Sequence, residues 1–265
     1  MIIDRLDDSL GAAVWDVDLS KPLGFCDRST LYDAWLEHLV LVFRNQDLTE
    51  AQQVEFSSIF GTPRVQDKPR TDSLPDKRPE VMLVGNVEDG ALGNGPVAFH
   101  SDSSFMPTPL KATSLYALEV PDEGGDTLFV NMYDVYERPE IYEDRERLKK
   151  NGRTALFSYT RAFDHVELSA RHPIVQRHEE TGRELIYLNR LHSKQVESFG
   201  VSHETDICVD CYLRDILNWI EEAPRYQHRW RPGDLVVWDN RCTQHARTDF
   251  SPTKRRLLRR VGIQP

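Results

Sequence analysis

Two short segments of the chain, about 140 residues apart, together supply two imidazoles and a carboxylate. The first is Phe99-His100-Ser101-Asp102, and the second runs from Trp238 to His245. Two neutral imidazoles and one carboxylate on one face of an octahedral metal form the 2-His-1-carboxylate arrangement of oxygen-activating Fe(II) enzymes, whose other positions stay open for substrate and O₂. His100, Asp102 and His245 are therefore the candidate iron ligands and the candidate catalytic centre.

Spacing alone does not single out the first segment. His100 and Asp102 are two residues apart, so in an extended segment both side chains leave the same face of a strand. In an acid-rich chain with nine histidines, however, one His-x-Asp triplet arises by chance with about even odds. His165-Val166-Glu167 and His178-Glu179-Glu180 are look-alikes of this kind. The second precedes Thr181-Gly182, a polar turn signal, which predicts a solvated hairpin tip.

The setting of His100 resembles the taurine dioxygenase and 2,4-dichlorophenoxyacetate dioxygenase (TauD/TfdA) family of Fe(II)/2-oxoglutarate oxygenases. The likeness recurs in order along most of the chain, at residues 11–20, 41–46, 48–53, 60–61, 99–109, 124–129, 172–173 and 238–241. One block would carry little weight, but the ordered set is strong. The resemblance implies a double-stranded β-helix, a jelly-roll core of the cupin kind.

The resemblance also implies a set of functional residues. His100, Asp102 and His245 correspond to the ligands of Fe(II). Arg256, eleven residues beyond His245, occupies the position that anchors the far carboxylate of 2-oxoglutarate, and a guanidinium matches a carboxylate in bidentate geometry. Thr127 matches the residue that adds a hydroxyl hydrogen bond. The implied reaction uses O₂ to convert 2-oxoglutarate to succinate and CO₂ while a substrate is oxidised.

A second arginine bears on the substrate. Arg260 lies four residues beyond Arg256 on the same face of a predicted strand, about 13 Å along it at standard rise. In the family, an arginine at this position contacts the acidic group of the substrate or flanks the co-substrate. Arg260 therefore predicts a small anionic substrate, namely a carboxylate, sulfonate or sulfate ester. The alternative, that it only lends charge to the 2-oxoglutarate end, stays open.

Departures from the taurine pattern mark further candidate substrate residues. Gln66 stands where taurine enzymes carry a substrate-binding histidine, and Pro96, with Asn94 nearby, replaces a polar residue before the first ligand. His192 lies where the family often shows an aromatic pocket residue, and Phe105 follows the ligand pair. Loops vary most where substrates differ. These changes argue against taurine itself and make Gln66, Asn94, Phe105 and His192 candidate pocket residues.

The pattern of predicted elements agrees with that fold: mainly β with flanking helices (α+β), in a single domain over residues 1–265. Short β-rich segments occur at residues 14–17, 39–43, 81–84, 113–118, 127–131, 184–188, 234–238 and 256–263. Helices are predicted at residues 29–39, 49–60, 134–151 and 204–220. A jelly-roll sandwich with helices outside one sheet would bring the two ligand segments together at one mouth.

Composition limits the partners and the compartment. The net charge of −10 argues against a nucleic-acid partner, and no stretch approaches the roughly 18 apolar residues of a membrane span. An acidic start without a signal-peptide plan and four cysteines, too few for a disulfide framework, predict a cytoplasmic protein. Cys208 and Cys211 are interpreted as buried thiols on a helix rather than zinc ligands. A homo-oligomer is left open.

Three functional hypotheses follow. The first is a 2-oxoglutarate-dependent dioxygenase that hydroxylates, and thereby in some cases cleaves, a small anionic molecule in catabolism. The second keeps Fe(II), 2-oxoglutarate and O₂ but assigns a biosynthetic tailoring role, in which an amino acid or acyl group is hydroxylated or desaturated. The third is a jelly-roll metal protein that binds a ligand without turnover.

Overall fold

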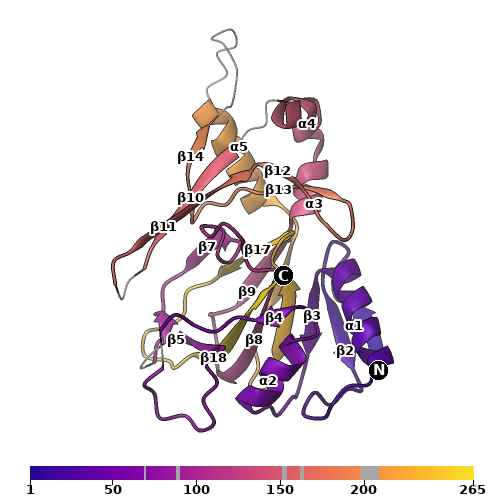
Figure 1. Cartoon of the computed structure of the whole chain (residues 1–265), viewed down its shortest axis with the longest axis vertical. Helices are drawn as coiled ribbons and strands as arrows, with labels where there is room; N and C mark the ends of the chain where they lie inside the picture. Colours follow the sequence, from indigo (N-terminus) through magenta and orange to yellow (C-terminus); the bar gives the residue numbers. More distant parts are fainter. Residues whose placement is uncertain (69, 88–89, 151–153, 162–163, 198–208) are drawn as a thin grey trace.

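The core consists of two β-sheets that face each other (Figure 1). The structure is a computed structural model, and it describes residues 1–68, 70–87, 90–150, 154–161, 164–197 and 209–265. The strands of the main sheet are, in spatial order, β1 (Ile2–Arg5), β2 (Ala12–Trp15), β3 (Val40–Phe43), β16 (Leu235–Asp239), β8 (Ala112–Glu119), β18 (Leu257–Gln264), β5 (Val81–Gly85) and β6 (Ala91–Leu92), with β4 (Thr62–Pro63) paired to β18. The strands of the minor sheet are β15 (Arg225–His228), β9 (Thr127–Asn131), β17 (Thr243–Arg247) and β7 (Val97–His100). The predicted mainly β, jelly-roll class is confirmed.

Smaller elements surround this core (Figure 1). The additional strands are β10 (Thr154–Thr160), β11 (Glu167–Pro173) and β14 (Ser193–Glu197) in one sheet, and the hairpin of β12 (Val175–Arg177) and β13 (Glu184–Ile186). The helices are α1 (Phe25–His38), α2 (Glu50–Ser57), α3 (Met132–Glu137), α4 (Pro139–Lys150) and α5 (Val209–Glu222). The added strands and α3 to α5 lie at one end of the molecule, whereas α1 and α2 lie beside the main sheet.

The main sheet is buried on both faces, and β16 shows how. Along this strand Val236 and Trp238 belong to the core between the sheets, where Trp238 meets Phe129 of β9 at 5.3 Å between ring centroids. The alternate residues Leu235 and Val237 belong to a second core beneath α1 and α2. Because side chains alternate across a strand, one sheet separates two hydrophobic cores. The inner one borders the functional site.

Local chemistry accounts for the helix boundaries. The predicted capping box of Thr49 and Gln52 is present at the start of α2. The single helix predicted for residues 134–151 is instead two, α3 and α4, which meet at Arg138 with an extended ψ of 139°. The reason is Pro139, because a proline disfavours the helical conformation of the residue before it. The helix predicted at 204–220 is observed from Val209, and residues 204–208 lie outside the described part.

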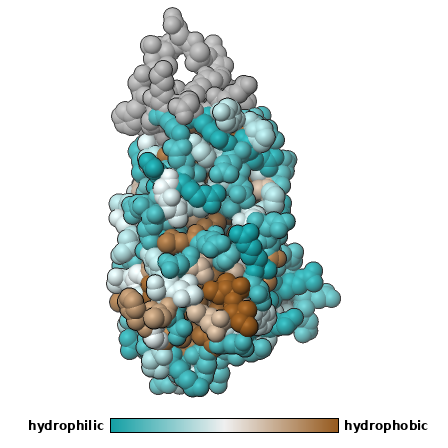
Figure 2. Space-filling view, turned by 90° about the vertical axis from the view of Figure 1, so that its right-hand side faces the viewer, coloured by the Kyte–Doolittle hydropathy of each residue, from teal (hydrophilic) through white to brown (hydrophobic). Residues whose placement is uncertain are grey.

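The described residues include no helix long and apolar enough to cross a membrane. Figure 2 shows the side of the molecule that carries α1, where apolar side chains form small patches among hydrophilic ones. Scattered apolar residues of this kind are normal on protein surfaces. Cys208 lies outside the described residues, and of Cys211 only the backbone, in α5, is described. The interpretation of these cysteines as buried thiols therefore stays a prediction.

Candidate active site

Strand pairing places the two histidines side by side. β7 and β17 are antiparallel neighbours in which His100 lies directly opposite His245. Opposed residues of such a pair extend their side chains on the same face, and the two imidazole centroids are 4.1 Å apart. The pairing of β7 with β17 thus brings together two histidines that are about 140 residues apart in sequence.

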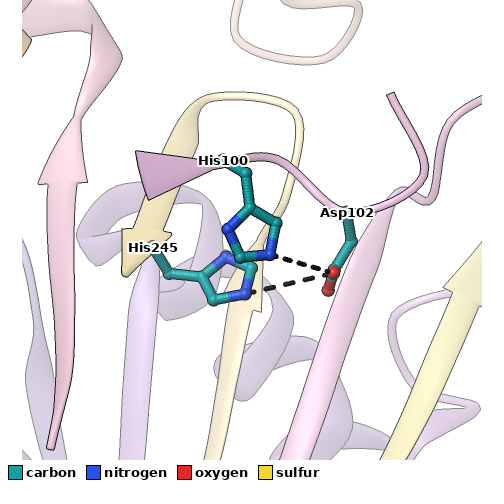
Figure 3. A group of neighbouring side chains, drawn as sticks. All are labelled: His100, Asp102 and His245. Carbon is teal, nitrogen blue, oxygen red and sulfur yellow. Dashed lines mark ion pairs between the residues drawn. The ribbon is translucent and has the colours of Figure 1, made fainter. Parts of the chain in front are cut away.

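Asp102 reaches the same point from a turn. β7 ends at His100, and Asp102 lies in the turn that follows rather than in one extended segment with His100. The turn still directs the carboxylate to the imidazoles: Asp102 Oδ1 is 3.7 Å from His100 Nε2 and 4.0 Å from His245 Nε2 (Figure 3). One ligand atom from each residue lies within 4.8 Å of the others.

Asn240 holds the backbone of that turn. The amide N–H of Asp102 donates to Asn240 Oδ1 at 2.6 Å, and Asn240 Nδ2 donates back to the carbonyl oxygen of Asp102 at 2.9 Å. The same Nδ2 donates to the carbonyl of Leu110 at 2.8 Å. Asn240 is buried, and it holds the turn through backbone atoms of Asp102 rather than through its side chain.

The two carboxylate oxygens of Asp102 have different environments. Oδ2 accepts from the hydroxyl of Thr113 at 2.7 Å and lies 2.8 Å from Arg260 Nη2. Oδ1 faces the imidazoles. Burial alone would raise the pKa of this carboxyl, but the charge and hydrogen bond of Arg260 hold the pKa well below its usual range. Asp102 is therefore an anion whose Oδ1 is available for one metal bond.

Both imidazoles are neutral and suitably oriented. Nδ1–H of His100 donates to the carbonyl oxygen of Ala98 at 2.9 Å, because a carbonyl can only accept, and this leaves the lone pair on Nε2. Burial, followed by the neighbouring His100, lowers the pKa of His245 to about 3. Two neutral imidazoles and one carboxylate fit a divalent first-row metal such as Fe(II).

Arg256 lies at the inner end of the same space. Its side chain is only 1% exposed, its Nε donates to the carbonyl oxygen of Gly125 at 3.1 Å, and its Nη1 is buried with no partner among the described residues. Burial, followed by the charge of Arg247, lowers its pKa to about 9. A buried cation with an unused donor fits a carboxylate ligand.

The hydroxyl of Thr127 is oriented by a residue that the sequence did not single out. Trp230 Nε1 donates to Thr127 Oγ1 at 3.0 Å. An indole N–H can only donate, so Thr127 must accept there, and its own hydroxyl proton is free to reach another acceptor. Thr127 can therefore donate to a carboxylate held by Arg256.

These residues line one cavity of about 570 Å³. Its described lining contains nine of the ten predicted site residues: His100, Asp102, His245, Thr127, Arg256, Arg260, Gln66, Phe105 and His192. Asn94 is not among the described residues that line it. Its backbone carbonyl accepts from the amide N–H of Phe250 at 3.4 Å, on the loop that leads to β7.

The predicted substrate residues form a wall beside the metal ligands. Phe105 stacks on Tyr159 at 4.8 Å between centroids, and His192 meets both Phe105 and His100 edge-on at 5.1 and 5.7 Å. Gln66 Nε2 donates to two backbone carbonyls, at 3.0 and 3.2 Å, so its side-chain oxygen is the part left for a substrate. The cavity thus offers an aromatic side and a few polar groups.

The look-alike at His178 has another role. The predicted hairpin is present between β12 and β13, but His178 is only 3% exposed, so the expectation of a solvated tip is wrong at this residue. Its Nε2 lies 3.0 Å from Asp239 Oδ2, and its Nδ1 accepts from the amides of Glu180 and Thr181. Both ring nitrogens are engaged, which indicates a structural histidine.

Four residues of the site were missed in the sequence. Thr113 and Asn240 hold Asp102, Trp230 orients Thr127, and Arg247 lines the inner end of the cavity. Asn240 offered a signal, since it lies between the strand residue Trp238 and the candidate ligand His245. The others carried none, because their roles depend on strand register.

The comparisons with known proteins agree with this geometry. The family described as "Taurine catabolism dioxygenase TauD, TfdA family" matches residues 3–261. The chain belongs to this family. Its members are Fe(II)- and 2-oxoglutarate-dependent dioxygenases that use O₂, which establishes the chain as an oxidoreductase of that class and removes the hypothesis of a metal protein without turnover.

Curated relatives and solved structures match over nearly the full length. The chain is 30% identical to pentalenolactone F synthase of Streptomyces avermitilis, over 98% of this chain and 93% of that protein. It is also 30% identical to (S)-phenoxypropionate/alpha-ketoglutarate-dioxygenase of Sphingobium herbicidovorans, over 97% and 92%. A taurine dioxygenase structure from Burkholderia xenovorans superimposes with a TM-score of 0.81 at 27% identity, covering 99% of this chain and 90% of that one.

Proposed function

We propose that this TauD/TfdA family dioxygenase hydroxylates a small organic anion at an Fe(II) ion held by His100, Asp102 and His245, with 2-oxoglutarate anchored by Arg256 and Thr127. The observation that carries the proposal is the convergence in one cavity of three metal-type ligands and a buried guanidinium with an unused donor. When bound, Fe(II) and 2-oxoglutarate supply the activation of O₂.

The residues of the chain then have separate tasks. Thr113 and Arg260 hold Asp102 Oδ2 and so keep Oδ1 directed to the metal. Arg256 and Thr127 bind the far carboxylate and set the direction from which 2-oxoglutarate reaches the metal. The aromatic wall of Phe105 and His192 excludes water from the side where the substrate approaches.

The chemical class of the substrate is inferred from the cavity and from relatives. Arg260 lines the cavity with a guanidinium of which only Nη2 pairs with Asp102 in the contacts described, so its other nitrogens can face a substrate anion. The Sphingobium relative is named for phenoxypropionate, an aromatic carboxylate, and this fits a wall of Phe105 and Tyr159. The relationship to pentalenolactone F synthase supports a biosynthetic tailoring oxygenase as the second candidate.

We further propose a cytoplasmic, single-domain enzyme over residues 1–265, with no nucleic-acid or membrane partner and with a homo-oligomer as an allowed assembly. The net charge of −10 and the lack of a membrane-spanning helix among the described residues support this placement.

The defining experiment follows succinate formation by the purified chain with Fe(II), ascorbate, O₂ and 2-oxoglutarate. Candidate carboxylates, sulfonates, sulfate esters and amino acids are added one at a time, and product analysis separates the two candidates. We expect one class of anion to stimulate succinate formation and to be hydroxylated. Stimulation by neutral compounds alone would contradict the assignment of an anionic substrate.

His245→Ala tests the ligand set. Loss of one of three ligands is expected to abolish substrate-dependent succinate formation and to weaken Mn(II) binding, measured by calorimetry. His165→Ala is the matched control, because His165 is exposed and belongs to a look-alike motif. If His245→Ala produces succinate as fast as the unaltered chain, His245 is not a ligand.

Arg256→Gln tests the co-substrate anchor. Truncating one partner of a buried charge pair typically costs about 2 to 5 kcal/mol, so the apparent KM for 2-oxoglutarate should rise by orders of magnitude. Arg255→Gln is the control, since Arg255 is the next residue but is exposed and paired with Glu119 at 2.7 Å. An unchanged KM in Arg256→Gln would place the anchor elsewhere.

A further inference from the structure

Besides Arg256 and Arg260, a further arginine, Arg247, faces the end of the cavity where the far carboxylate of 2-oxoglutarate is proposed to bind. Arg247 lies on β17 directly opposite Thr127 of β9. It is two residues beyond His245, and residues two apart on a strand share a face. The register therefore directs Arg247 to the same interior face as the proposed metal ligand and the proposed co-substrate residue. Its side chain lines the cavity, and the residue is 7% exposed.

The guanidinium of Arg247 is only partly used by the protein. Its Nη2 donates to the carbonyl oxygen of Leu92, the last residue of β6, at 2.7 Å, and to that of Gly95 on the loop between β6 and β7. Its Nε and Nη1 are buried with no partner among the described residues, as is Nη1 of Arg256. Both guanidinium carbons lie near the ring of Phe250, at 5.5 Å for Arg247 and 5.9 Å for Arg256.

Two buried cations in one place require an anion. No carboxylate of the described residues forms an ion pair with Arg247 or Arg256. Asp126 acts on Arg256 only from a longer range and accepts a hydrogen bond from Gln227 at 2.6 Å. Buried charges in proteins are normally paired, and leaving a charge unpaired in the interior is strongly unfavourable. A ligand carboxylate between the two arginines would satisfy both, because it has two oxygens and about four acceptor positions.

We propose that Arg247 is a second cationic binding residue for the far carboxylate of 2-oxoglutarate, and that it links this carboxylate to the loop at Leu92 and Gly95. The inference rests on the proposed function, in which Arg256 anchors that carboxylate. It adds a second positive charge at the same end of the co-substrate. Through Arg247 the co-substrate would also contact the segment that precedes β7 and His100.

The test measures binding without turnover. Calorimetry in the absence of O₂, with Mn(II) present, gives the Kd of 2-oxoglutarate and of 2-oxovalerate, which has the same length but lacks the far carboxylate. The unaltered protein should favour 2-oxoglutarate strongly. In Arg247→Gln we expect the Kd of 2-oxoglutarate to rise at least about tenfold, with little change for 2-oxovalerate. A merely structural role would weaken both ligands equally, and that result would overturn the proposal.

Two further variants separate this inference from the function on which it rests. Arg256→Gln should lose the preference for 2-oxoglutarate, and Arg255→Gln should retain it. If Arg256→Gln loses the preference and Arg247→Gln keeps it, only the inference on Arg247 fails. If both keep it, the proposed anchor itself fails.

A measurement on the unaltered protein keeps the inference testable should Arg247→Gln fold poorly. Hydrogen exchange of the backbone amides at residues 92–95 should become slower when 2-oxoglutarate is added with Mn(II), and should respond much less to 2-oxovalerate. Equal protection by both ligands, or none by either, would contradict the link between the far carboxylate and the loop.

Discussion

At the scale of the residue, the main feature is the division of labour between the two oxygens of Asp102. A free carboxylate can bind a metal through one oxygen or both. Here Thr113 and Arg260 occupy Oδ2, and Oδ1 alone faces His100 and His245. Partners of this kind fix the orientation of a ligand and commonly change metal affinity by 10- to 100-fold when removed.

Thr113→Val tests this role of the hydroxyl. The substitution keeps the shape of the side chain but removes the hydrogen bond to Oδ2, so the Kd for Mn(II), measured by calorimetry, should rise by about 10-fold or more. Thr154→Val is the matched control, because the hydroxyl of Thr154 is buried with no partner among the described residues. Equal metal affinity in the two variants would show that Arg260 alone fixes the carboxylate.

At the scale of the element, the carboxylate of Glu180, two residues after His178, holds the β12–β13 hairpin against the core. Glu180 accepts from the hydroxyl of Tyr32 in α1 and pairs with Arg241 at 2.6 Å and Lys111 at 3.0 Å. Burial alone would raise the pKa of Glu180, but these hydrogen bonds lower it to about 2. Glu180 at the hairpin tip therefore holds the β12–β13 hairpin to Tyr32, Lys111 and Arg241 by ion pairs and a hydrogen bond.

The lowered pKa predicts a dependence of stability on pH. The folded protein holds Glu180 ionised more firmly than the unfolded chain, so its contribution is complete above pH 4.5 and is lost as the pH falls towards about 2. Glu180→Gln should lower the Tm at neutral pH, and the difference from the unaltered protein should shrink across that window. Glu179→Gln, in the neighbouring exposed residue, is the control. A Tm difference independent of pH would contradict the ionic contribution.

The elements also show what the sequence could and could not predict. The capping box at Thr49 and the β-branched run of β16 follow local rules, and both were predicted. β7 and β17, which carry the two histidines, were not predicted as strands. They are only four and five residues long, and β17 consists of polar residues apart from Ala246, so it lacks the alternation on which strand prediction depends. Departures from local rules of this kind are expected at functional sites.

The family motifs located the proposed metal and co-substrate residues, but not the residues that support them. The function of Thr113, Trp230 and Arg247 depends on which strands become neighbours, and one sequence does not contain that information in local form. Asn94 was predicted as a pocket residue because it lies near Pro96, which replaces a polar residue of the taurine pattern. It is not among the described residues that line the cavity, and its backbone carbonyl accepts from Phe250 instead.

At the scale of the whole molecule, the order of the strands has a consequence for how the protein is made. β16 lies between β3 and β8, β18 lies between β8 and β5, and β17 lies between β9 and β7. Residues 235–264 therefore supply inner strands to both sheets. Until the ribosome has released them, the main sheet is three separate pieces and the minor sheet is two. The unpaired edges of these pieces are prone to associate with other chains. A nascent chain that has not reached residue 245 lacks one of the three proposed iron ligands, and loss of residues 235–264 would leave aggregation-prone fragments in place of a smaller folded enzyme.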